Sequence, residues 1–236
     1  MNKNSQVEIS GSMVDFPGGN KSKKTKGYLV KPHGAAKSPA VIVIHEFWGL
    51  VEHIKDVARR FAAEGYTALA VDLFDEKSAS KPEDAMKIRQ EFSEEKVLGD
   101  LKGAIAYLKT LDSVNPNGIG SVGFCMGGWL SFSLACHAKE AGAVIFYGRV
   151  PAQLDLVKDL SCPMLGNYGG ADLGIPSPDI ERLKVALTKY GKKFDIKVYP
   201  GAPHAFFNDT RESFRPDAAK DAWTRTLAFF KETLRK

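Results

Sequence analysis

The sequence contains few cysteines and no long apolar segment. Three cysteines occur among 236 residues, and none belongs to a Cys-x-x-Cys motif. So small and odd a number argues against a disulfide framework, and without clustered histidines it argues against a zinc site. The apolar run AVIVI is far too short to span a membrane, and the N-terminal stretch MNKNSQVEISGSMVDF lacks the apolar core of a signal peptide. We therefore expect a cytoplasmic protein without metal or organic cofactor, acting neither in nor on a membrane.

The charge of the chain also excludes a class of partner. The formal net charge is +5, but lysine and arginine are spread along the chain and mostly alternate with acidic residues. The one local excess, NKSKKTKGYLVK, matches no recognised nucleic-acid-binding motif. A solvated basic edge explains it, so we expect no nucleic-acid partner. The sequence is equally compatible with a monomer and a weak dimer.

Apolar, strand-like segments alternate with amphipathic, helix-like segments along the chain. Hydrophobic residues make up 44% of the sequence and charged residues 26%, as in ordinary globular proteins. Such an alternation predicts one α/β domain over 1–236, with a mostly parallel central sheet and helices on both faces. Residues 1–25 are expected to form a polar extension or an edge strand. The expected strands are 26–32, 40–46, 66–74, 119–124, 142–147, 162–170 and 194–200, and the expected helices are 52–65, 80–95, 96–111, 126–138, 177–191 and 216–236.

Cys125 stands in a turn that joins a strand to a helix. The sequence Gly-Phe-Cys-Met-Gly has the G-x-C-x-G spacing of a nucleophile elbow, with cysteine in place of serine. Glycines two residues away on either side remove side chains that would collide with neighbouring backbone, and the following helix N-terminus favours a thiolate. The motif alone is compatible with a nucleophile and with an inert thiol in a tight turn.

An acid and a histidine follow Cys125 in the order typical of elbow hydrolases. Asp172 lies in the glycine-rich loop GGADLGIP, and His204 lies in GAPHAFF after the last expected strand. Because the carboxyl ends of parallel strands share one edge of a sheet, we expect both side chains near Cys125. The pattern predicts an α/β-hydrolase fold with Cys125, His204 and Asp172 as nucleophile, base and acid. By contrast, we expect His53 to be an exposed residue without a role.

A fourth candidate, Glu46, follows the apolar run AVIVI and His45. A carboxylate there could simply mark where the chain leaves the sheet for water. In the elbow architecture, however, the loop after this strand supplies one N–H of the oxyanion hole, and the residue after the nucleophile supplies the other. We therefore expect the backbone N–H groups of Phe47 and Met126 to face the developing oxyanion.

Taken together, these segments resemble the dienelactone hydrolase family of α/β-hydrolases. The matching pieces are VIVIHEFWGL, YTALAVDLF, GSVGFCMGG, GGADLGIP and GAPHAFF, in that order. The resemblance implies a Cys125–His204–Asp172 triad, with Glu46 as the group that takes the thiol proton when substrate binds. It further implies that the thiolate then turns to His204 and attacks an ester or lactone carbonyl. A thioester forms, which water activated by His204 hydrolyses.

The resemblance is weaker where substrate is recognised. Family members bind a substrate carboxylate through two arginines, one of them shortly after the histidine, where this sequence has Asn208. Arg89 could replace the other arginine, and Arg211 and Arg215 are further candidates. We therefore expect a hydrolase of small carboxylic esters or lactones that is less selective than its relatives.

Aromatic residues around the expected site favour an apolar or aromatic acyl group. Trp48, Phe206 and Phe207 are candidate substrate-binding residues beside Arg89, although each could instead pack a loop onto the sheet. Two other readings remain open. A thioesterase or acyl transferase could use the same triad, because specificity depends on the surrounding loops, and a binding protein could retain the fold without catalysis.

Overall fold

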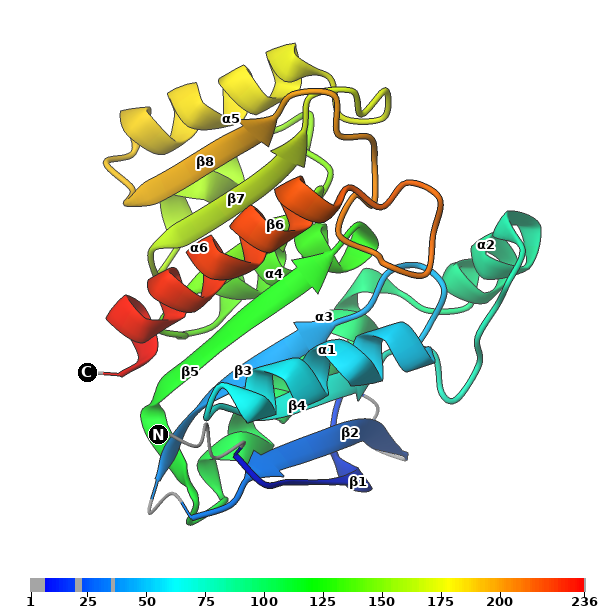
Figure 1. Cartoon of the computed structure of the whole chain (residues 1–236), viewed down its shortest axis with the longest axis vertical. Helices are drawn as coiled ribbons and strands as arrows, with labels where there is room; N and C mark the ends of the chain where they lie inside the picture. Colours follow the sequence, from blue (N-terminus) through cyan, green and yellow to red (C-terminus); the bar gives the residue numbers. More distant parts are fainter. Residues whose placement is uncertain (1–6, 20–22, 35–36, 236) are drawn as a thin grey trace, which may run out of the picture.

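A computed structural model describes residues 7–19, 23–34 and 37–235, and an eight-stranded sheet forms its centre. The strands lie in the order β1-β2-β4-β3-β5-β6-β7-β8 (Figure 1). From β4 to β8 all neighbours are parallel, whereas β1 pairs antiparallel with β2 and β2 with β4. The prediction of a mostly parallel sheet is confirmed. The strands are β1 (Ile9–Pro17), β2 (Lys24–Pro32), β3 (Ser38–Ile44), β4 (Thr67–Asp72), β5 (Val114–Phe124), β6 (Ala143–Phe146), β7 (Met164–Gly169) and β8 (Phe194–Tyr199).

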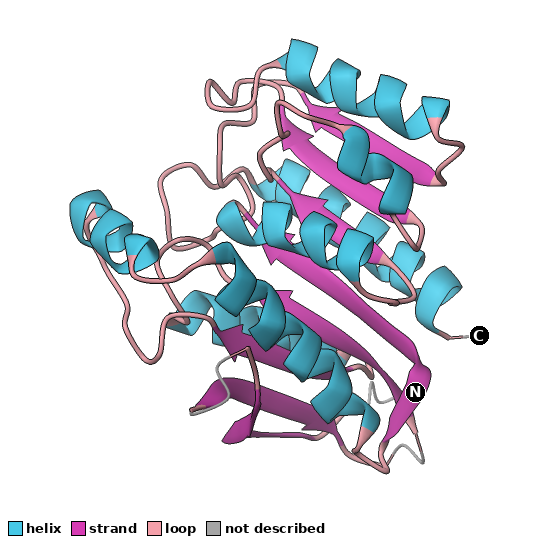
Figure 2. Cartoon of the chain, turned by 180° about the vertical axis from the view of Figure 1, so that it is seen from behind, coloured by secondary structure: helices cyan, strands magenta, loops and turns pink. Residues whose placement is uncertain are grey.

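Helices cover both faces of the sheet, as predicted. Helices α1 and α6 lie on one face (Figure 1), and α3, α4 and α5 lie on the other (Figure 2). In the described ranges, no helix is both long and apolar enough to cross a bilayer. The helices are α1 (Glu52–Ala63), α2 (Pro82–Gln90), α3 (Glu94–Lys109), α4 (Met126–His137), α5 (Ser177–Lys189) and α6 (Pro216–Leu234), with a short 3-10 helix η1 (Asp155–Asp159).

Two hydrophobic cores result from the alternation of side chains along the central strands. Val41 and Val43 of β3 join the core beneath α1 and α6, whereas Ile42 and Ile44 join the core beneath α3. Both sets are fully buried, and each such side chain stabilises the fold by roughly 1.5–3 kcal/mol. Strand β3 thus carries apolar side chains on both of its faces, which suits a position in the middle of the sheet. The carboxyl end of β3 leads into the site.

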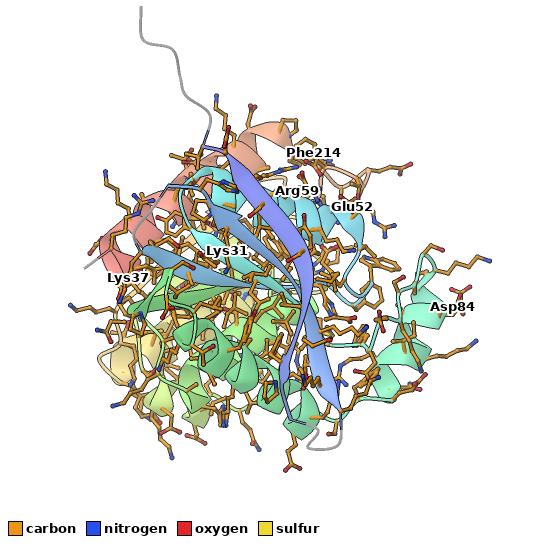
Figure 3. The ribbon with its side chains drawn as sticks, turned by 90° about the horizontal axis from the view of Figure 1, so that it is seen from below. Lys31, Lys37, Glu52, Arg59, Asp84 and Phe214 are labelled. Atoms are coloured by element: carbon orange, nitrogen blue, oxygen red, sulfur yellow. The ribbon has the colours of Figure 1, made fainter. Side chains whose placement is uncertain are left out.

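The structure differs from the sequence prediction in the segment over 80–95. The helix expected there ends at Gln90, and α3 begins at Glu94 because the Ser93 hydroxyl accepts a hydrogen bond from the Lys96 N–H at 3.1 Å. This N-cap separates α2 from α3. Helix α2, which carries Asp84, projects from the rest of the molecule (Figure 3).

The N-terminal segment forms an edge strand over part of its length. Strand β1 pairs with β2 from Ile9 to Pro17. Of the two alternatives for 1–25, the edge strand therefore applies to these residues, whereas 1–6 and 20–22 lie outside the described ranges. Strand β5 is also five residues longer at its start than expected, and η1 has no counterpart among the expected elements.

Candidate active site

Cys125 occupies a strained turn at the carboxyl end of β5. Its backbone is left-handed, with φ 55° and ψ −112°, and α4 begins at the next residue. The Cys125 N–H donates to the Phe146 carbonyl at 3.0 Å, which ties the turn to the end of β6. A non-glycine residue in such a conformation costs about 1–3 kcal/mol, and its neighbours must hold it there. The turn therefore fixes the direction of the thiol.

The two elbow glycines are required by close backbone contacts. A Cβ at Gly123 would lie 1.8 Å from the Gly127 carbonyl oxygen. A Cβ at Gly127 would lie 2.3 Å from the Ile44 carbonyl oxygen. Any side chain at either position would force β5, α4 and the end of β3 apart. The G-x-C-x-G spacing thus reflects how tightly these three elements meet around Cys125.

His204 and Asp172 are joined by a short hydrogen bond. The Nδ1–H of His204 donates to Asp172 Oδ2 at 2.6 Å, and the other Asp172 oxygen accepts the Gly174 N–H at 2.9 Å. Asp172 is buried, whereas 41% of the His204 side chain is exposed at the site. Burial lowers the pKa of His204, but Asp172 and the Cys125 sulfur outweigh it and raise this pKa to about 10. The imidazole is therefore poised to carry a proton beside a thiolate.

Glu46 is a buried carboxylate at the end of β3. It is 2% exposed, and its Oε2 accepts a hydrogen bond from the Asn208 side-chain amide at 2.8 Å. Its Oε1 has no hydrogen-bond partner among the described residues. Burial raises the pKa of Glu46, and Asn208, His204, Arg211 and Tyr147 offset part of this rise. Glu46 therefore holds a proton more readily than an ordinary carboxylate.

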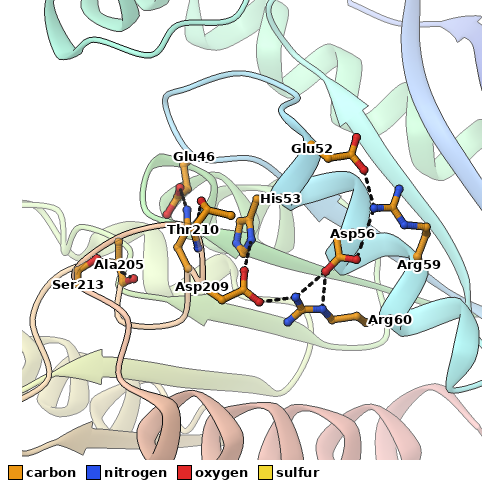
Figure 4. Close-up of polar contacts among 11 residues, drawn as sticks. Glu46, Glu52, His53, Asp56, Arg59, Arg60, Ala205, Asp209, Thr210 and Ser213 are labelled. Carbon is orange, nitrogen blue, oxygen red and sulfur yellow. Dashed lines mark hydrogen bonds and ion pairs between the residues drawn. The ribbon is translucent and has the colours of Figure 1, made fainter.

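The loop between β8 and α6, which carries His204 and Asn208, is anchored to α1 through Asp209, as Figure 4 shows. Asp209 accepts a hydrogen bond from His53 Nδ1 at 3.1 Å and pairs with the Arg60 guanidinium. The expectation that His53 is exposed is wrong, since it is 5% exposed and its Nε2 finds no partner in the described structure. The sequence gives no sign of this contact, because Asp209 lies 156 residues away.

A cavity of about 720 Å³ opens next to Cys125 and His204. This volume is typical of sites for small organic ligands. Most of its surface is apolar, and charged groups stand among the lining residues. The lining residues are Phe47, Arg89, Gln90, Glu94, Cys125, Met126, Trp129, Leu130, Tyr147, Arg149, Gly174, Ile175 and His204.

Of the expected substrate-binding residues, only Arg89 lines this cavity. Phe206 is fully buried and packs against Tyr199, with ring centroids 5.1 Å apart. Phe207 is 3% exposed and packs against Phe146 at 4.8 Å, so both phenylalanines belong to the core. Trp48 stacks under the Arg211 guanidinium at 4.2 Å and is not among the lining residues.

The expected oxyanion-hole residues flank the nucleophile. Phe47 and Met126 both line the cavity with Cys125. In the described parts of the chain, neither backbone N–H is engaged in a hydrogen bond outside helices and strands. Met126 is also the first residue of α4, where a helical N–H has no partner within the helix. Both donors are available to an oxygen atom of a ligand.

Sequence reasoning missed Tyr147, Trp129 and Arg149, all of which line the cavity. Tyr147 directly follows β6, so the rule that functional groups gather at the carboxyl ends of strands could have found it. Trp129 and Arg149 gave no comparable signal. They meet only in three dimensions, where the Arg149 guanidinium lies 4.9 Å from the Trp129 ring.

The site offers no grouping of metal ligands. Across residues 7–19, 23–34 and 37–235, no cluster of three or more His, Cys, Asp or Glu side chains could hold a metal ion. The groups present are a thiol, an imidazole, two carboxylates and two backbone donors. They suit nucleophilic attack on a carbonyl carbon and stabilisation of the resulting oxyanion.

Comparison with known proteins gives consistent results. Residues 25–234 match the model of the dienelactone hydrolase family. A relative from Synechocystis sp., named "Putative carboxymethylenebutenolidase", is 33% identical over 97% of this chain and 99% of its own length. A relative of the same name from Saccharolobus solfataricus is 36% identical over 88% of this chain and 94% of its own length.

Solved structures share the fold. The crystal structure titled "Putative Dienelactone Hydrolase" from Klebsiella pneumoniae superimposes with a TM-score of 0.88 at 30% identity, covering 94% of this chain and 98% of the other. An acylaminoacyl peptidase from Pyrococcus horikoshii gives a TM-score of 0.79 at 14% identity, over 98% of this chain and 43% of its own. The α/β-hydrolase fold expected from the sequence is thereby confirmed.

Proposed function

The chain belongs to the dienelactone hydrolase family and is a hydrolase of ester or lactone bonds, and from this premise we propose that Cys125 is its nucleophile. His204 is the general acid and base, Asp172 orients it, and the N–H groups of Phe47 and Met126 bind the oxyanion. The observation that carries the proposal is the strained Cys125 turn opening into a cavity beside the His204–Asp172 pair.

Acylation begins when the thiol proton passes to Glu46. Burial raises the pKa of Glu46, so this carboxylate can hold the proton. The thiolate attacks the carbonyl carbon, and the C–O π electrons move to the oxygen that faces the two N–H donors. As the tetrahedral intermediate collapses, the C–O bond to the leaving group breaks. The leaving oxygen takes a proton from His204, and a thioester remains on Cys125.

Deacylation uses the same histidine as a base. Part of the rise in the pKa of His204 comes from Cys125. Once the sulfur is acylated, its negative charge is gone and the pKa of His204 falls, so the imidazole stays neutral in the acyl-enzyme. It can therefore accept a proton from water as the water oxygen attacks the thioester. The C–S bond breaks, the acid is released, and the thiolate recovers its proton from Glu46.

The cavity favours an acyl group without charge. Its walls include Trp129, Leu130 and Ile175. The two arginines at the cavity, Arg89 and Arg149, each lie within 4.0 Å of the Glu94 carboxylate, which partly neutralises them. Asn208 stands where the resemblance implies an arginine, and it binds Glu46 instead. We therefore propose small esters or lactones with apolar or aromatic acyl groups as substrates.

The cellular setting follows from the thiol. A nucleophilic cysteine must remain reduced and is otherwise lost to oxidation. The three cysteines are free thiols, and Cys125 is partly exposed. We accordingly place the protein in the cytoplasm as a monomer or weak dimer that acts on small molecules.

A panel of substrates tests the proposal. Wild type and Cys125→Ala are assayed with p-nitrophenyl acetate, neutral lactones, anionic lactones and a thioester. We expect Cys125→Ala to lose at least about a thousandfold in kcat/KM, as expected for removal of a nucleophile. Cys162→Ala is the matched control and should keep full activity, because Cys162 is buried outside the cavity. Ester hydrolysis that survives in Cys125→Ala would refute the assignment.

A further inference from the structure

Tyr147 is held in an unusual conformation at the end of β6. Its φ is 39°, in the left-handed region that bulky residues rarely adopt. Its backbone N–H donates to the Asn167 carbonyl at 2.8 Å, and its side chain is fully buried. The backbone strain persists only because the surroundings determine it. The direction of the Tyr147 ring is therefore fixed, and it points toward the site.

The ring stands among the proposed catalytic groups. It packs edge to face with the His204 ring, with centroids 5.1 Å apart and planes inclined at 62°. Tyr147 lines the same cavity as Cys125. Burial, the nearby Glu46 carboxylate and the Cys125 sulfur raise the pKa of Tyr147 well above 10. Its hydroxyl consequently keeps its proton at neutral pH, and it acts as a donor toward an anion.

In the described structure two buried polar atoms of the site have no hydrogen-bond partner, although their side chains are near enough for each to shift the other's pKa. Within the described residues, these are the Tyr147 hydroxyl and Oε1 of Glu46. The hydroxyl offers a hydrogen and Oε1 offers a lone pair, so each supplies what the other lacks. A buried polar group without a partner costs about 1–3 kcal/mol, which favours their pairing.

We propose that the Tyr147 hydroxyl donates a hydrogen bond to Glu46 Oε1 when Glu46 is ionised, and that Tyr147 thereby positions Glu46 to take the thiol proton. Asn208 already donates to Oε2, so both carboxylate oxygens are then satisfied. The inference rests on the proposed function. Tyr147 acts through Glu46 and is a positioning residue.

Other groups around Glu46 do not replace this donor. His204 and Arg211 from the β8–α6 loop lower its pKa through charge alone. His45, the neighbour in sequence, donates from Nδ1 to the Glu46 main-chain carbonyl, while its Nε2 accepts the Leu73 N–H at 3.3 Å. Neither contact reaches Oε1. Loss of the Tyr147 hydroxyl would leave that oxygen without a side-chain donor.

The variant Tyr147→Phe removes the hydroxyl and keeps the ring. Without the donor the pKa of Glu46 rises, so Glu46 stays protonated at a pH where it should accept the thiol proton. In the pH profile of kcat/KM for p-nitrophenyl acetate, we expect the acidic limb to shift to higher pH by about one unit. A shift of this size follows from losing a hydrogen bond to a charged group. Tyr168→Phe is the matched control, because Tyr168 is equally buried and only burial affects its pKa. Its profile should equal that of wild type.

A second variant tests the same contact in the opposite direction. Substituting 3,5-difluorotyrosine for Tyr147 keeps the shape of the ring and makes the hydroxyl a stronger donor. The acidic limb should then move to lower pH. This variant also covers the case in which Tyr147→Phe fails to fold. A limb that stays at its wild-type position in the folded variants would overturn the proposal.

The Glu46→Gln background separates positioning from simple loss of stability. If Tyr147 acts through Glu46, adding Tyr147→Phe to Glu46→Gln changes kcat/KM no further. A further tenfold loss in the double variant would contradict the proposal. If wild type shows no hydrolysis dependent on Cys125, the proposed function fails by itself. The rate of Cys125 alkylation by iodoacetamide across pH then tests the Tyr147 contact alone, with the same expected shift and the same overturning result.

Discussion

Backbone strain at single residues gathers around the site. Among the described residues, five other than glycine have positive φ: Asp75, Glu76, Cys125, Tyr147 and Ala205. Cys125 and Tyr147 line the cavity, and Ala205 directly follows His204. Each left-handed residue costs about 1–3 kcal/mol, which the packing around it must offset. Strain is thus concentrated where the directions of the thiol, the phenol and the imidazole matter.

Glu46→Gln should stabilise the protein while lowering its activity. Burial raises the pKa of Glu46 above its ordinary 4.5, so the unfolded chain releases this proton at a lower pH than the folded chain does. The free energy of unfolding therefore falls as pH rises above about 4.5. Glutamine carries no charge and avoids this loss, so we expect a gain of about 1 kcal/mol at pH 7. Urea unfolding at pH 4 and pH 7 measures it.

The effect of Glu46→Gln on kcat is measured with p-nitrophenyl acetate. Without a proton acceptor, kcat of Glu46→Gln should fall at least about tenfold. An unchanged kcat in the folded variant would remove Glu46 from the mechanism. A variant that is less stable at pH 7 than wild type would show that the buried carboxylate is not a destabilising group.

At the scale of an element, the β8–α6 loop decides the geometry. It brings His204 to Asp172 and Asn208 to Glu46, and Asp209 fastens it to α1 through His53 and Arg60. The loop has no regular secondary structure between Tyr199 and Pro216. Its shape therefore depends on these side-chain contacts, and Figure 4 shows those that Asp209 makes with His53 and Arg60.

Asp209→Ala should loosen this loop. The pKa of Asp209 is lowered because Arg60 and His53 outweigh its burial, so its contribution to stability is present above about pH 3.8. In the variant, buried His53 has no partner at either ring nitrogen. We expect a loss of about 1–3 kcal/mol at pH 7 and a lower kcat/KM. Differential scanning calorimetry and ester hydrolysis measure the two effects.

Glu52→Ala provides the comparison on the same helix. Glu52 is exposed and pairs with Arg59 at the surface, where such contacts contribute at most about 1 kcal/mol. We expect little change in stability or activity. Equal stability of the two variants would show that Asp209 does not anchor the loop.

Sequence reasoning located the strands well because apolar runs and glycines mark them locally. It placed Asp172 and His204 at one sheet edge with Cys125, and their hydrogen bond is present in the structure. It could not separate Phe206 and Phe207 from the substrate cavity, since both follow His204 closely and only packing shows that they face the core. The burial of His53 likewise depends on a contact between distant segments.

At the scale of the whole molecule, β5 separates the site from Glu140, a half-buried residue whose carboxylate Oε2 is buried. Glu140 follows α4 and contacts Ser121 of β5. Ser121 lies four residues before Cys125 in the chain, which corresponds to about 13 Å along an extended strand. Oε1 of Glu140 accepts the Ser121 hydroxyl at 3.1 Å, and its Oε2 is unpaired in the described structure. Burial raises the pKa of Glu140 to about 8. This group has no part in the proposed mechanism.

Glu140→Gln should make stability less dependent on pH. Between about pH 4.5 and pH 8 the unfolded chain ionises Glu140 while the folded chain keeps the proton, so the free energy of unfolding falls across this window. We expect the variant to match wild type near pH 5 and to exceed it by about 1–3 kcal/mol at pH 8. Thermal unfolding across this range, with exposed Glu232→Gln as control, measures the difference. A constant gap at both pH values would contradict burial as the cause.

The central claim is that hydrolysis proceeds through a thioester on Cys125. Mass spectrometry of the enzyme, quenched in acid during turnover of p-nitrophenyl acetate, tests it most directly. We expect the added mass of one acetyl group on the peptide that contains Cys125, and none in Cys125→Ala. In His204→Ala, any acyl-enzyme that forms should accumulate to a greater extent, because its hydrolysis lacks the base. Unmodified Cys125 during active turnover, or an acetyl group on another residue needed for activity, would contradict it.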